Sequence, residues 1–228
     1  MAEASRTVPE VEACFVKIPV SHGHLEASLR EPSSDPTGAA VVCHPHPLHG
    51  GTMQTKAVYR AAQALAEAGL RGLRFNFRGV GASTGSYEDG IGEREDVRAA
   101  LDWLSRDTPA LPLVAGGFSF GSMVGLGEAV SDDRVVALIG LGLPFDMYDY
   151  SYLSGSSKPV LIVQGEDDEF GSGERAAAAV DALGEHVTLA RIAGADHYFT
   201  GRFDELRAVI VEYFTLGEGA KALKAARS

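Results

Sequence analysis

The chain has 228 residues, of which 45% are hydrophobic and 22% charged, and this balance is typical of a globular protein with one sizeable core. Its formal charge of -11 argues against binding to nucleic acid, because affinity for phosphates depends on clustered Lys and Arg side chains. The polar first residues do not resemble a signal peptide and no apolar run reaches the roughly 20 residues that cross a bilayer, so we expect a cytoplasmic protein without membrane contact.

The first structured segment is predicted to be an antiparallel hairpin at a sheet edge, because residues 12–18 and 24–30 alternate apolar and polar side chains. From residue 39 onward, short apolar runs alternate with helical patterns, which indicates a doubly wound, mostly parallel eight-stranded sheet with helices on both faces. The remaining strands are predicted at 39–43, 70–75, 111–116, 135–141, 159–163 and 187–192, and the helices around 57–65, 97–104, 120–131, 173–183 and 203–216.

We expect a single domain over residues 1–228, with a core at about 12–216 and a frayed basic tail at 217–228. The charges of this tail are interpreted as solvated rather than as a site for an anionic partner. Cys14 and Cys43 are expected to be free, buried thiols, as is usual in a cytosolic α/β domain.

Residues 114–123 contain the pattern Gly-x-Ser-x-Gly between a strand-like and a helix-like apolar run. A nucleophilic serine on a tight strand-to-helix turn requires this context. Gly117 and Gly121 flank Ser119, so the backbone can double back without meeting a side chain. We therefore expect Ser119 to be a nucleophile, exposed at the N-terminus of a helix.

A second match to the pattern, residues 81–85 around Ser83, has a different context. It lies several residues after the strand that ends near Phe77, and polar residues rather than a helix follow it. The pattern also arises easily by chance in a chain with 27 glycines. The context favours Ser119 over Ser83.

A serine nucleophile needs a base to accept its proton, and the base needs an acceptor that orients it. His197 is predicted to be the base, because it lies in the loop after the last strand, where catalytic groups collect in open α/β sheets. For the acceptor, the acidic run 166–169 follows a predicted central strand, and we choose Asp168 over Asp167. Asp146, in the loop after the preceding strand, is the alternative outside this run.

An acyl-transfer site also needs backbone N–H donors aimed at the developing oxyanion. The first predicted donor is the N–H of Phe120. The second is expected from loop 44–51, whose two prolines lack an N–H, so that His46 and Leu48 remain as candidates. The sequence leaves the choice between these two residues open.

Loop 44–51 also contains three histidines, His44, His46 and His49. A loop interrupted by prolines, without a second ligand cluster, does not indicate a metal site, and we expect no metal or other cofactor. Residues 116–123 have the glycine spacing of a phosphate-binding loop but lack its Lys. Nucleotide binding is therefore not predicted.

The order of the three candidates along the chain, serine, aspartate and histidine, resembles that of the α/β-hydrolase superfamily. Residues 76–85 look like the loop after strand four of that superfamily, which would give Ser83 a structural explanation. The His-Pro-His-Pro-Leu stretch at 44–48 is similar to a compact bacterial branch close to dienelactone-hydrolase-like proteins and small serine esterases. True dienelactone hydrolases carry a cysteine nucleophile, whereas this chain has Ser119, so their substrate is not transferred to it.

Members of this superfamily often carry a helical lid after strand six. Only about 18 residues separate Leu141 from Pro159, which is too short for a substantial lid and implies an open pocket. Phe145, Tyr148 and Met123 are predicted to bind the substrate. Further candidates for the lining come from the segment that would carry a lid, namely Met147, Tyr150, Tyr152 and Leu153.

These features predict an enzyme that hydrolyses a small carboxylic ester through an acyl-enzyme intermediate. A thioesterase, an amidase or a small-peptide hydrolase would use the same acyl chemistry and is the alternative. A noncatalytic binding or scaffold protein that keeps the fold is a further alternative. Acyl length, leaving group and the choice between a monomer and a homodimer do not follow from the sequence.

Overall fold

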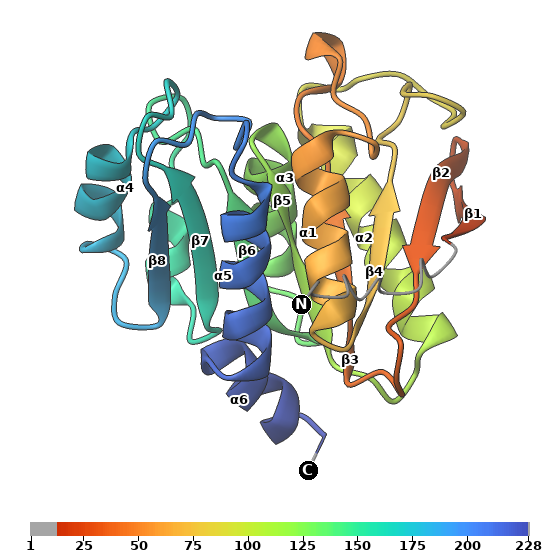
Figure 1. Ribbon diagram of the computed structural model, residues 1–228. Coiled ribbons are helices and arrows are strands. Elements are labelled where there is room, and N and C mark those ends of the chain that lie inside the picture. The colour runs from red at the N-terminus through yellow and green to blue at the C-terminus, as the bar shows by residue number, and fades with distance from the viewer. Residues whose placement is uncertain (1–12, 228) are drawn as a thin grey trace, which may run out of the picture.

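Eight strands form one twisted sheet in the computed structural model, which describes residues 13–227 (Figure 1). The strands lie in the order β1-β2-β4-β3-β5-β6-β7-β8; β2 pairs antiparallel with β1 and β4, and the other pairs are parallel. Their bounds are β1 Cys14–Val20, β2 Gly23–Arg30, β3 Gly38–Cys43, β4 Leu70–Phe75, β5 Leu113–Phe118, β6 Val135–Leu141, β7 Val160–Gly165 and β8 Val187–Ile192. The predicted mostly parallel sheet with an N-terminal antiparallel hairpin is confirmed.

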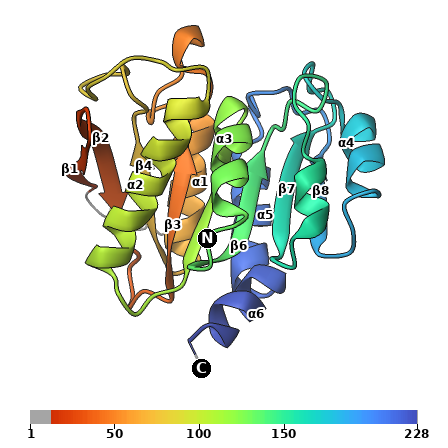
Figure 2. The same ribbon diagram turned by 180° about the vertical axis from the view of Figure 1, so that it is seen from behind.

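Six α-helices of the described residues cover the two faces of this sheet (Figures 1 and 2). One face carries α1 (Lys56–Glu67), α5 (Phe203–Thr215) and α6 (Glu218–Ala225). The other carries α2 (Ile91–Asp107), α3 (Phe120–Ala129) and α4 (Gly173–Val180). Two short 3-10 turns, η1 (Pro47–His49) and η2 (Ser151–Gly155), lie in connecting loops.

The sheet separates two clusters of buried apolar side chains. Strand β3 shows why, because its successive side chains point to opposite faces. Val41 and Cys43 belong to the cluster under α2 and α3, whereas Ala40 and Val42 belong to the cluster under α1 and α5. Strands that are buried on both faces in this way produce the unbroken apolar runs of the sequence.

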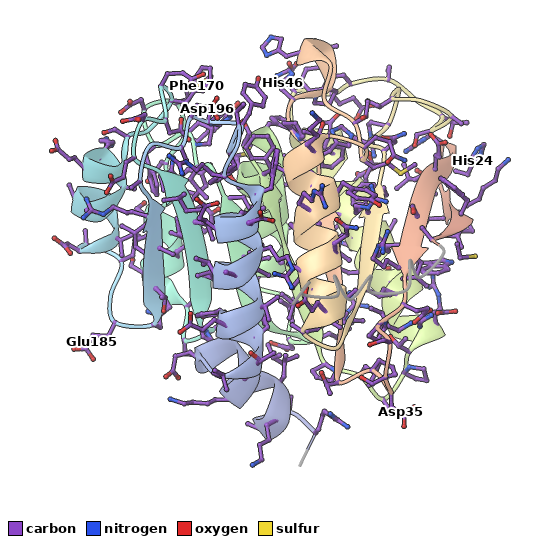
Figure 3. All side chains as sticks on the ribbon, viewed as in Figure 1. His24, Asp35, His46, Phe170, Glu185 and Asp196 are labelled. Carbon is purple, nitrogen blue, oxygen red and sulfur yellow. The ribbon has the colours of Figure 1, made fainter. Side chains whose placement is uncertain are left out.

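The strand order brings four loops together at one edge of the sheet. Strand β3 pairs with β5 up to Cys43 and Gly117, and β7 pairs with β8 up to Gly165 and Ile192, so the chain leaves all four strands on the same side. Figure 3 shows His46, Phe170 and Asp196 at this edge, and Asp35 and Glu185 at the opposite one. Loops at the carboxyl ends of parallel strands form the usual binding edge of such folds.

The expectation of a frayed tail is wrong. Residues 218–225 form α6, which packs against α5, and the side chain of Leu223 is buried in the cluster beneath α1 and α5. Burial of this leucine, with Gly219 also buried, gives the segment a reason to dock. The predicted hairpin begins at Glu12, which lies outside the described residues.

Two further expectations concern the cysteines and a lid. Cys14 and Cys43 are both free, as predicted, but only Cys43 is buried, because Cys14 lies on the exposed edge strand β1. Between β6 and β7 the chain forms only loop and the single turn of η2, so this connection carries no lid, as predicted. None of the helices in residues 13–227 is long and apolar enough to cross a membrane.

Candidate active site

Ser119 occupies a strained turn between β5 and α3. Its φ of 56° and ψ of -124° lie in a region that residues with a side chain rarely adopt. A Cβ on Gly117 would lie 2.6 Å from the Gly121 carbonyl oxygen, and a Cβ on Gly121 would lie 2.5 Å from the Cys43 carbonyl oxygen. The turn therefore requires both glycines, and it places the half-buried Ser119 at the first turn of α3.

Ser119, His197 and Asp168 form one chain of hydrogen-bonded side chains. The Oγ of Ser119 lies 3.0 Å from Nε2 of His197, and Nδ1 of His197 lies 2.9 Å from Oδ2 of Asp168. Both His197 and Asp168 are buried, with exposed fractions of 2% and 3%. A carboxylate at Nδ1 fixes the tautomer whose Nε2 faces the serine as an acceptor, which is the arrangement that activates a hydroxyl nucleophile.

The carboxylate of Asp168 is itself held by two donors. The Phe170 N–H donates to Oδ1 at 2.8 Å, and Nε2 of Gln164 donates to Oδ2 at 2.7 Å. Gln164 is fully buried at the end of β7, and its Oε1 accepts the Leu143 N–H at 2.8 Å. The side chain of Gln164 thus connects the loops after β6 and β7 and orients the aspartate.

Three aromatic rings surround the imidazole of His197. The ring centroids of Phe118, Phe170 and Tyr198 lie 4.9, 4.7 and 5.2 Å from that of His197. Such contacts restrict rotation of the imidazole and exclude water from its faces. The ring is therefore positioned by packing as well as by its hydrogen bonds.

The structure separates the rival candidates from this group. Ser83 is buried and its Oγ donates to the Asn76 carbonyl oxygen at 2.6 Å, so this serine holds its own loop together. Asp167 is exposed, and Asp146 is exposed and paired with Arg175 at 3.2 Å. Neither of these carboxylates has a contact with His197 within the described residues.

A hydrogen-bond chain on the far side of the turn supports its backbone. The hydroxyl of Ser122 donates to the Ser119 carbonyl oxygen at 2.6 Å, and the Tyr150 hydroxyl lies 3.0 Å from Ser122 Oγ. Because Ser122 uses its one hydrogen on the carbonyl, Tyr150 donates to it. Tyr150 is thus a buried support of the turn and does not line the cavity that contains Ser119.

The histidines of loop 44–51 have structural partners. Nδ1 of the buried His44 donates to the Pro45 carbonyl oxygen at 2.6 Å, and the Phe77 N–H donates to its Nε2 at 3.0 Å. Burial lowers the pKa of His44 to about 4, and the bond to Pro45 opposes this shift only in part. Within residues 13–227, no group of three or more His, Cys, Asp and Glu side chains could hold a metal ion.

The two candidates for the second N–H donor differ in their surroundings. The Leu48 N–H donates to Nδ1 of His46 at 3.2 Å, and the Leu48 side chain is 68% exposed. His46 lines the cavity at Ser119, and among the described residues its N–H has no acceptor. The geometry therefore favours His46 over Leu48 and leaves its N–H free to donate. At the start of α3, the Phe120 N–H also has no acceptor within its own helix.

A cavity of about 230 Å³ opens above Ser119. Of the three residues predicted to bind substrate, Tyr148 lines this cavity, but Phe145 and Met123 do not. Phe145 is buried with its ring 5.3 Å from that of Tyr150, and Met123 packs against the core under α2 and α3, because both positions face inward. The other lining includes Thr55, Pro144, Met147, Phe170 and Tyr198.

Three contributors to the site were missed by sequence reasoning, namely Gln164, Phe170 and Tyr198. Gln164 carried one usable signal, because it is a polar residue at the end of the apolar run 160–165. Phe170 lies two residues after the predicted acid and Tyr198 directly after the predicted base, but nothing in the sequence shows that their rings pack on His197.

Comparison with known proteins agrees with this fold. The family model of the alpha/beta hydrolase domain matches residues 39–207. An alpha-beta serine hydrolase homologue from Coxiella burnetii is 39% identical, with a TM-score of 0.81 over 90% of this chain and 98% of that one. The serine hydrolase without lid XC6422 from Xanthomonas campestris is 32% identical, with a TM-score of 0.81 over 89% and 93%.

A relative in Rickettsia prowazekii (strain Madrid E) is 34% identical over 200 residues, which are 84% of each chain. The matched family region contains Ser119, Asp168 and His197, and the two structures cover nearly all of the described fold. The chain belongs to the α/β-hydrolase family of enzymes and is similar to its lid-less bacterial serine hydrolases.

Proposed function

We propose that the protein hydrolyses a small carboxylic ester, with Ser119 as nucleophile, His197 as general base and Asp168 as the group that orients His197. The observation that carries this proposal is the continuous chain from Ser119 Oγ to the Asp168 carboxylate, with steps of 3.0 and 2.9 Å. A hydroxyl on a strained turn, with an acceptor already in place, needs little rearrangement before attack.

In the acylation step, Ser119 Oγ forms a bond to the ester carbonyl carbon while its proton moves to Nε2 of His197. The carbonyl oxygen becomes an oxyanion, which the N–H groups of Phe120 and His46 bind. The tetrahedral intermediate then collapses, the bond to the alcohol oxygen breaks, and His197 returns its proton to the leaving alcohol. Asp168 stays ionised throughout and stabilises the imidazolium that forms.

Deacylation repeats these steps with water in place of the serine. A water molecule gives a proton to Nε2 of His197 as its oxygen attacks the acyl carbon, and Ser119 leaves with the returned proton. The products are a carboxylic acid, an alcohol and the free enzyme. In both steps it is the neutral imidazole of His197 that accepts the proton.

The size of the cavity supports a small substrate. Its volume of about 230 Å³ is below the ~300 to 1,000 Å³ of sites that enclose drug-sized ligands. Its apolar lining includes Pro144, Met147 and Phe170, which suits a short aliphatic or aryl group. We therefore place acyl groups of a few carbons in this cavity.

The proposal is tested with the purified full-length protein and the aryl esters p-nitrophenyl acetate and p-nitrophenyl butyrate. Ser119→Ala is expected to lose at least about 10⁴-fold in kcat/KM, because no other group can form the acyl-enzyme. Ser83→Ala is the matched control and should retain activity. Hydrolysis by Ser119→Ala at the wild-type rate would reject the assignment.

Two further measurements separate the alternatives. A fluorophosphonate probe should label Ser119 of an enzyme, as mass spectrometry of the tryptic peptides shows, whereas a scaffold protein with an unactivated hydroxyl would not react. Comparison of matched esters, thioesters and amides of the same acyl group then decides the class of bond, since all three use the same chemistry. We expect the ester to have the highest kcat/KM.

A further inference from the structure

Two buried arginines lie under α1, and neither has a carboxylate partner among residues 13–227. In the antiparallel pair of β2 and β4, Ser28 faces Arg74 and Arg30 faces Gly72, so both guanidinium groups are on the same face of the sheet. Gly72 packs directly against α1, which places Arg30 and Arg74 beneath that helix. Their exposed fractions are only 8% and 2%.

The contacts of Arg74 are with neutral groups. Its Nη1 donates to the Met53 carbonyl oxygen at 2.5 Å and to Oε1 of Gln54 at 3.2 Å, and its Nη2 donates to Ser28 Oγ at 3.3 Å. Its guanidinium carbon lies 4.8 Å from the centroid of the Tyr59 ring. Burial lowers the pKa of Arg74 to about 10, which leaves the group charged at neutral pH.

Arg30 approaches the same tyrosine from another direction. Its Nη2 donates to the Tyr59 hydroxyl oxygen at 3.0 Å, and its guanidinium carbon lies 5.4 Å from the ring centroid. The Nε atoms of both Arg30 and Arg74 are buried and have no hydrogen-bond partner among the described residues. Two positive charges are thus held around Tyr59 with their hydrogen-bonding capacity only partly used.

This arrangement departs from the pattern in the rest of the described chain. Buried charges are normally paired, and arginines such as Arg71, Arg78 and Arg134 each bind two or more carboxylates. The chain has 31 Asp and Glu residues against 20 Lys and Arg, so carboxylates are plentiful. No carboxylate of the described residues pairs with Arg30 or Arg74 at Tyr59, so the negative charge that balances them has to come from a bound anion.

A pocket of about 280 Å³ opens directly over this cluster, between the first turns of α1 and α5, which lie side by side (Figure 1). Its lining consists of Gln54, Lys56, Tyr59, Arg60 and Phe203. Lys56 and Arg60 are exposed and form no ion pair within residues 13–227. They add two exposed cations to the two buried ones below.

Tyr59 connects the buried arginines to the pocket. Its hydroxyl oxygen accepts hydrogen bonds from Arg30 at 3.0 Å and from Nε2 of Gln63 at 3.5 Å. The hydroxyl hydrogen is therefore available to a ligand, and the guanidinium groups favour a negatively charged acceptor. Gln54 is placed similarly, because its Oε1 accepts from Arg74 and its amide N–H groups remain free to donate.

We propose that this pocket binds a carboxylate or phosphate group, held by the Tyr59 hydroxyl, Lys56 and Arg60. The pocket adjoins the site described above, because Thr55 lines the cavity at Ser119 while its neighbours Gln54 and Lys56 line this one. The anionic group therefore belongs to the ester substrate, a step that rests on the proposed function. A small anion that binds on its own is the other source of the same chemistry.

The first arm of the test measures binding of inorganic phosphate, by titration calorimetry, to the Ser119→Ala protein, so that its result does not depend on hydrolysis. Adding Lys56→Gln and Arg60→Gln together is expected to weaken binding by at least about tenfold, because charge-assisted contacts are lost. Tyr59→Phe should also weaken it. The control, Lys221→Gln with Arg106→Gln, removes the same charge from exposed positions on α6 and α2 and should leave binding unchanged.

The second arm compares hydrolysis of charged and neutral esters by the active enzyme. In the first pair, p-nitrophenyl hydrogen glutarate and p-nitrophenyl pentanoate, the charged ester carries its carboxylate on the acyl side. In the second pair, 4-acetoxybenzoate and phenyl acetate, the charged ester carries its carboxylate on the alcohol side. In Lys56→Gln/Arg60→Gln we expect KM for one charged ester to rise at least about tenfold, with KM for its neutral partner unchanged.

The outcomes separate this inference from the proposed function. Phosphate binding that depends on Lys56, Tyr59 and Arg60, without any ester hydrolysis, supports the anion pocket and rejects the esterase. Phosphate binding without selectivity for either charged ester assigns the pocket to a separate anion. No phosphate binding and no selectivity among the esters overturn the inference.

Discussion

The amide of Gln164 donates to the carboxylate of Asp168 at 2.7 Å, and this bond joins the end of β7 to the acid of the proposed triad. The same side chain accepts the Leu143 N–H at 2.8 Å and donates to the Gly171 carbonyl oxygen at 2.6 Å. A fully buried amide with these partners fixes the direction in which Asp168 faces His197. Gln164 acts on the reaction only through Asp168 and is a positioning residue.

Replacing Gln164 with Leu is therefore expected to lower kcat for p-nitrophenyl acetate by about 10- to 100-fold, which corresponds to loss of a hydrogen bond to a charged group. KM should change little, because Gln164 does not line the substrate cavity. A Gln164→Glu variant keeps the shape but places a second carboxylate beside Asp168, and we expect it to raise the pH at which activity appears. Melting temperatures show whether each variant is folded. An unchanged dependence of activity on pH in Gln164→Glu would speak against the positioning role.

The acidic run 166–169 offers a matched comparison for the acid itself. Asp168→Asn should lower kcat by about 10³- to 10⁴-fold, because the amide no longer stabilises the imidazolium or fixes its tautomer. Asp167→Asn and Asp146→Asn change exposed carboxylates away from His197 and should stay within about twofold of the wild type. Equal losses in Asp146→Asn and Asp168→Asn would move the acid to the loop after β6.

The fold could be predicted from the sequence because its strands are short apolar runs separated by helices with a clear apolar stripe, as in α1 with Ala57, Ala61 and Leu65. The tail lacked this signal. On α6 only Gly219 and Leu223 are buried, and a short segment with three charged residues and one large apolar side chain resembles a solvated tail. Its docking depends on the surface that the sheet and α5 present to it, which local sequence does not encode.

The three residues of the proposed triad could be located because each follows a strand, and strand ends meet at one edge of the sheet. The pocket could not be predicted equally well. Tyr148 and Phe145 are close in sequence, but only Tyr148 faces the cavity, because a loop without regular periodicity gives no information about the direction of its side chains. Gln164 was likewise hidden, since its partners come from two different loops, those after β6 and β7.

The glycines of the Ser119 turn predict a severe effect on stability. In Gly121→Ala the new Cβ would lie 2.5 Å from the Cys43 carbonyl oxygen, and backbone atoms of β3 cannot move away cheaply. We expect a loss of at least about 2 kcal/mol in the free energy of unfolding, measured by urea titration. Gly155→Ala adds the same methyl group where nothing lies within 4 Å and should be nearly neutral. Similar losses in both variants would show that the turn tolerates a side chain.

His44 predicts a dependence of stability on pH. Burial lowers its pKa in the folded protein to about 4, against an ordinary value of 6.5 in the unfolded chain. Between these values the unfolded chain binds a proton that the folded one does not. The stability that neutral His44 contributes is therefore complete above pH 6.5 and is lost as the pH falls toward 4.

The expected loss between pH 7 and pH 4.5 is about 2 kcal/mol from this residue. His44→Gln should be less stable than the wild type at pH 7, because the bonds to Pro45 and Phe77 are weakened, but its further loss on acidification should be smaller by that amount. Urea titrations of both proteins at the two pH values give the comparison. Parallel losses in the two proteins would show that other groups account for the acid sensitivity.

The docking of α6 can be tested with two leucines that are close in sequence and opposite in environment. Leu223 is 3% exposed and packs near Gly38 and Leu70, whereas Leu216 is 78% exposed. Leu223→Ala should lower the free energy of unfolding by about 2 to 5 kcal/mol, because it removes buried methyl groups and leaves a cavity. Leu216→Ala should change it by less than about 0.5 kcal/mol. A small change in stability in both variants would mean that the helix does not dock in solution. Leu223 lies at the edge of the sheet opposite the Ser119 cavity, so kcat of the folded Leu223→Ala protein should equal that of the wild type.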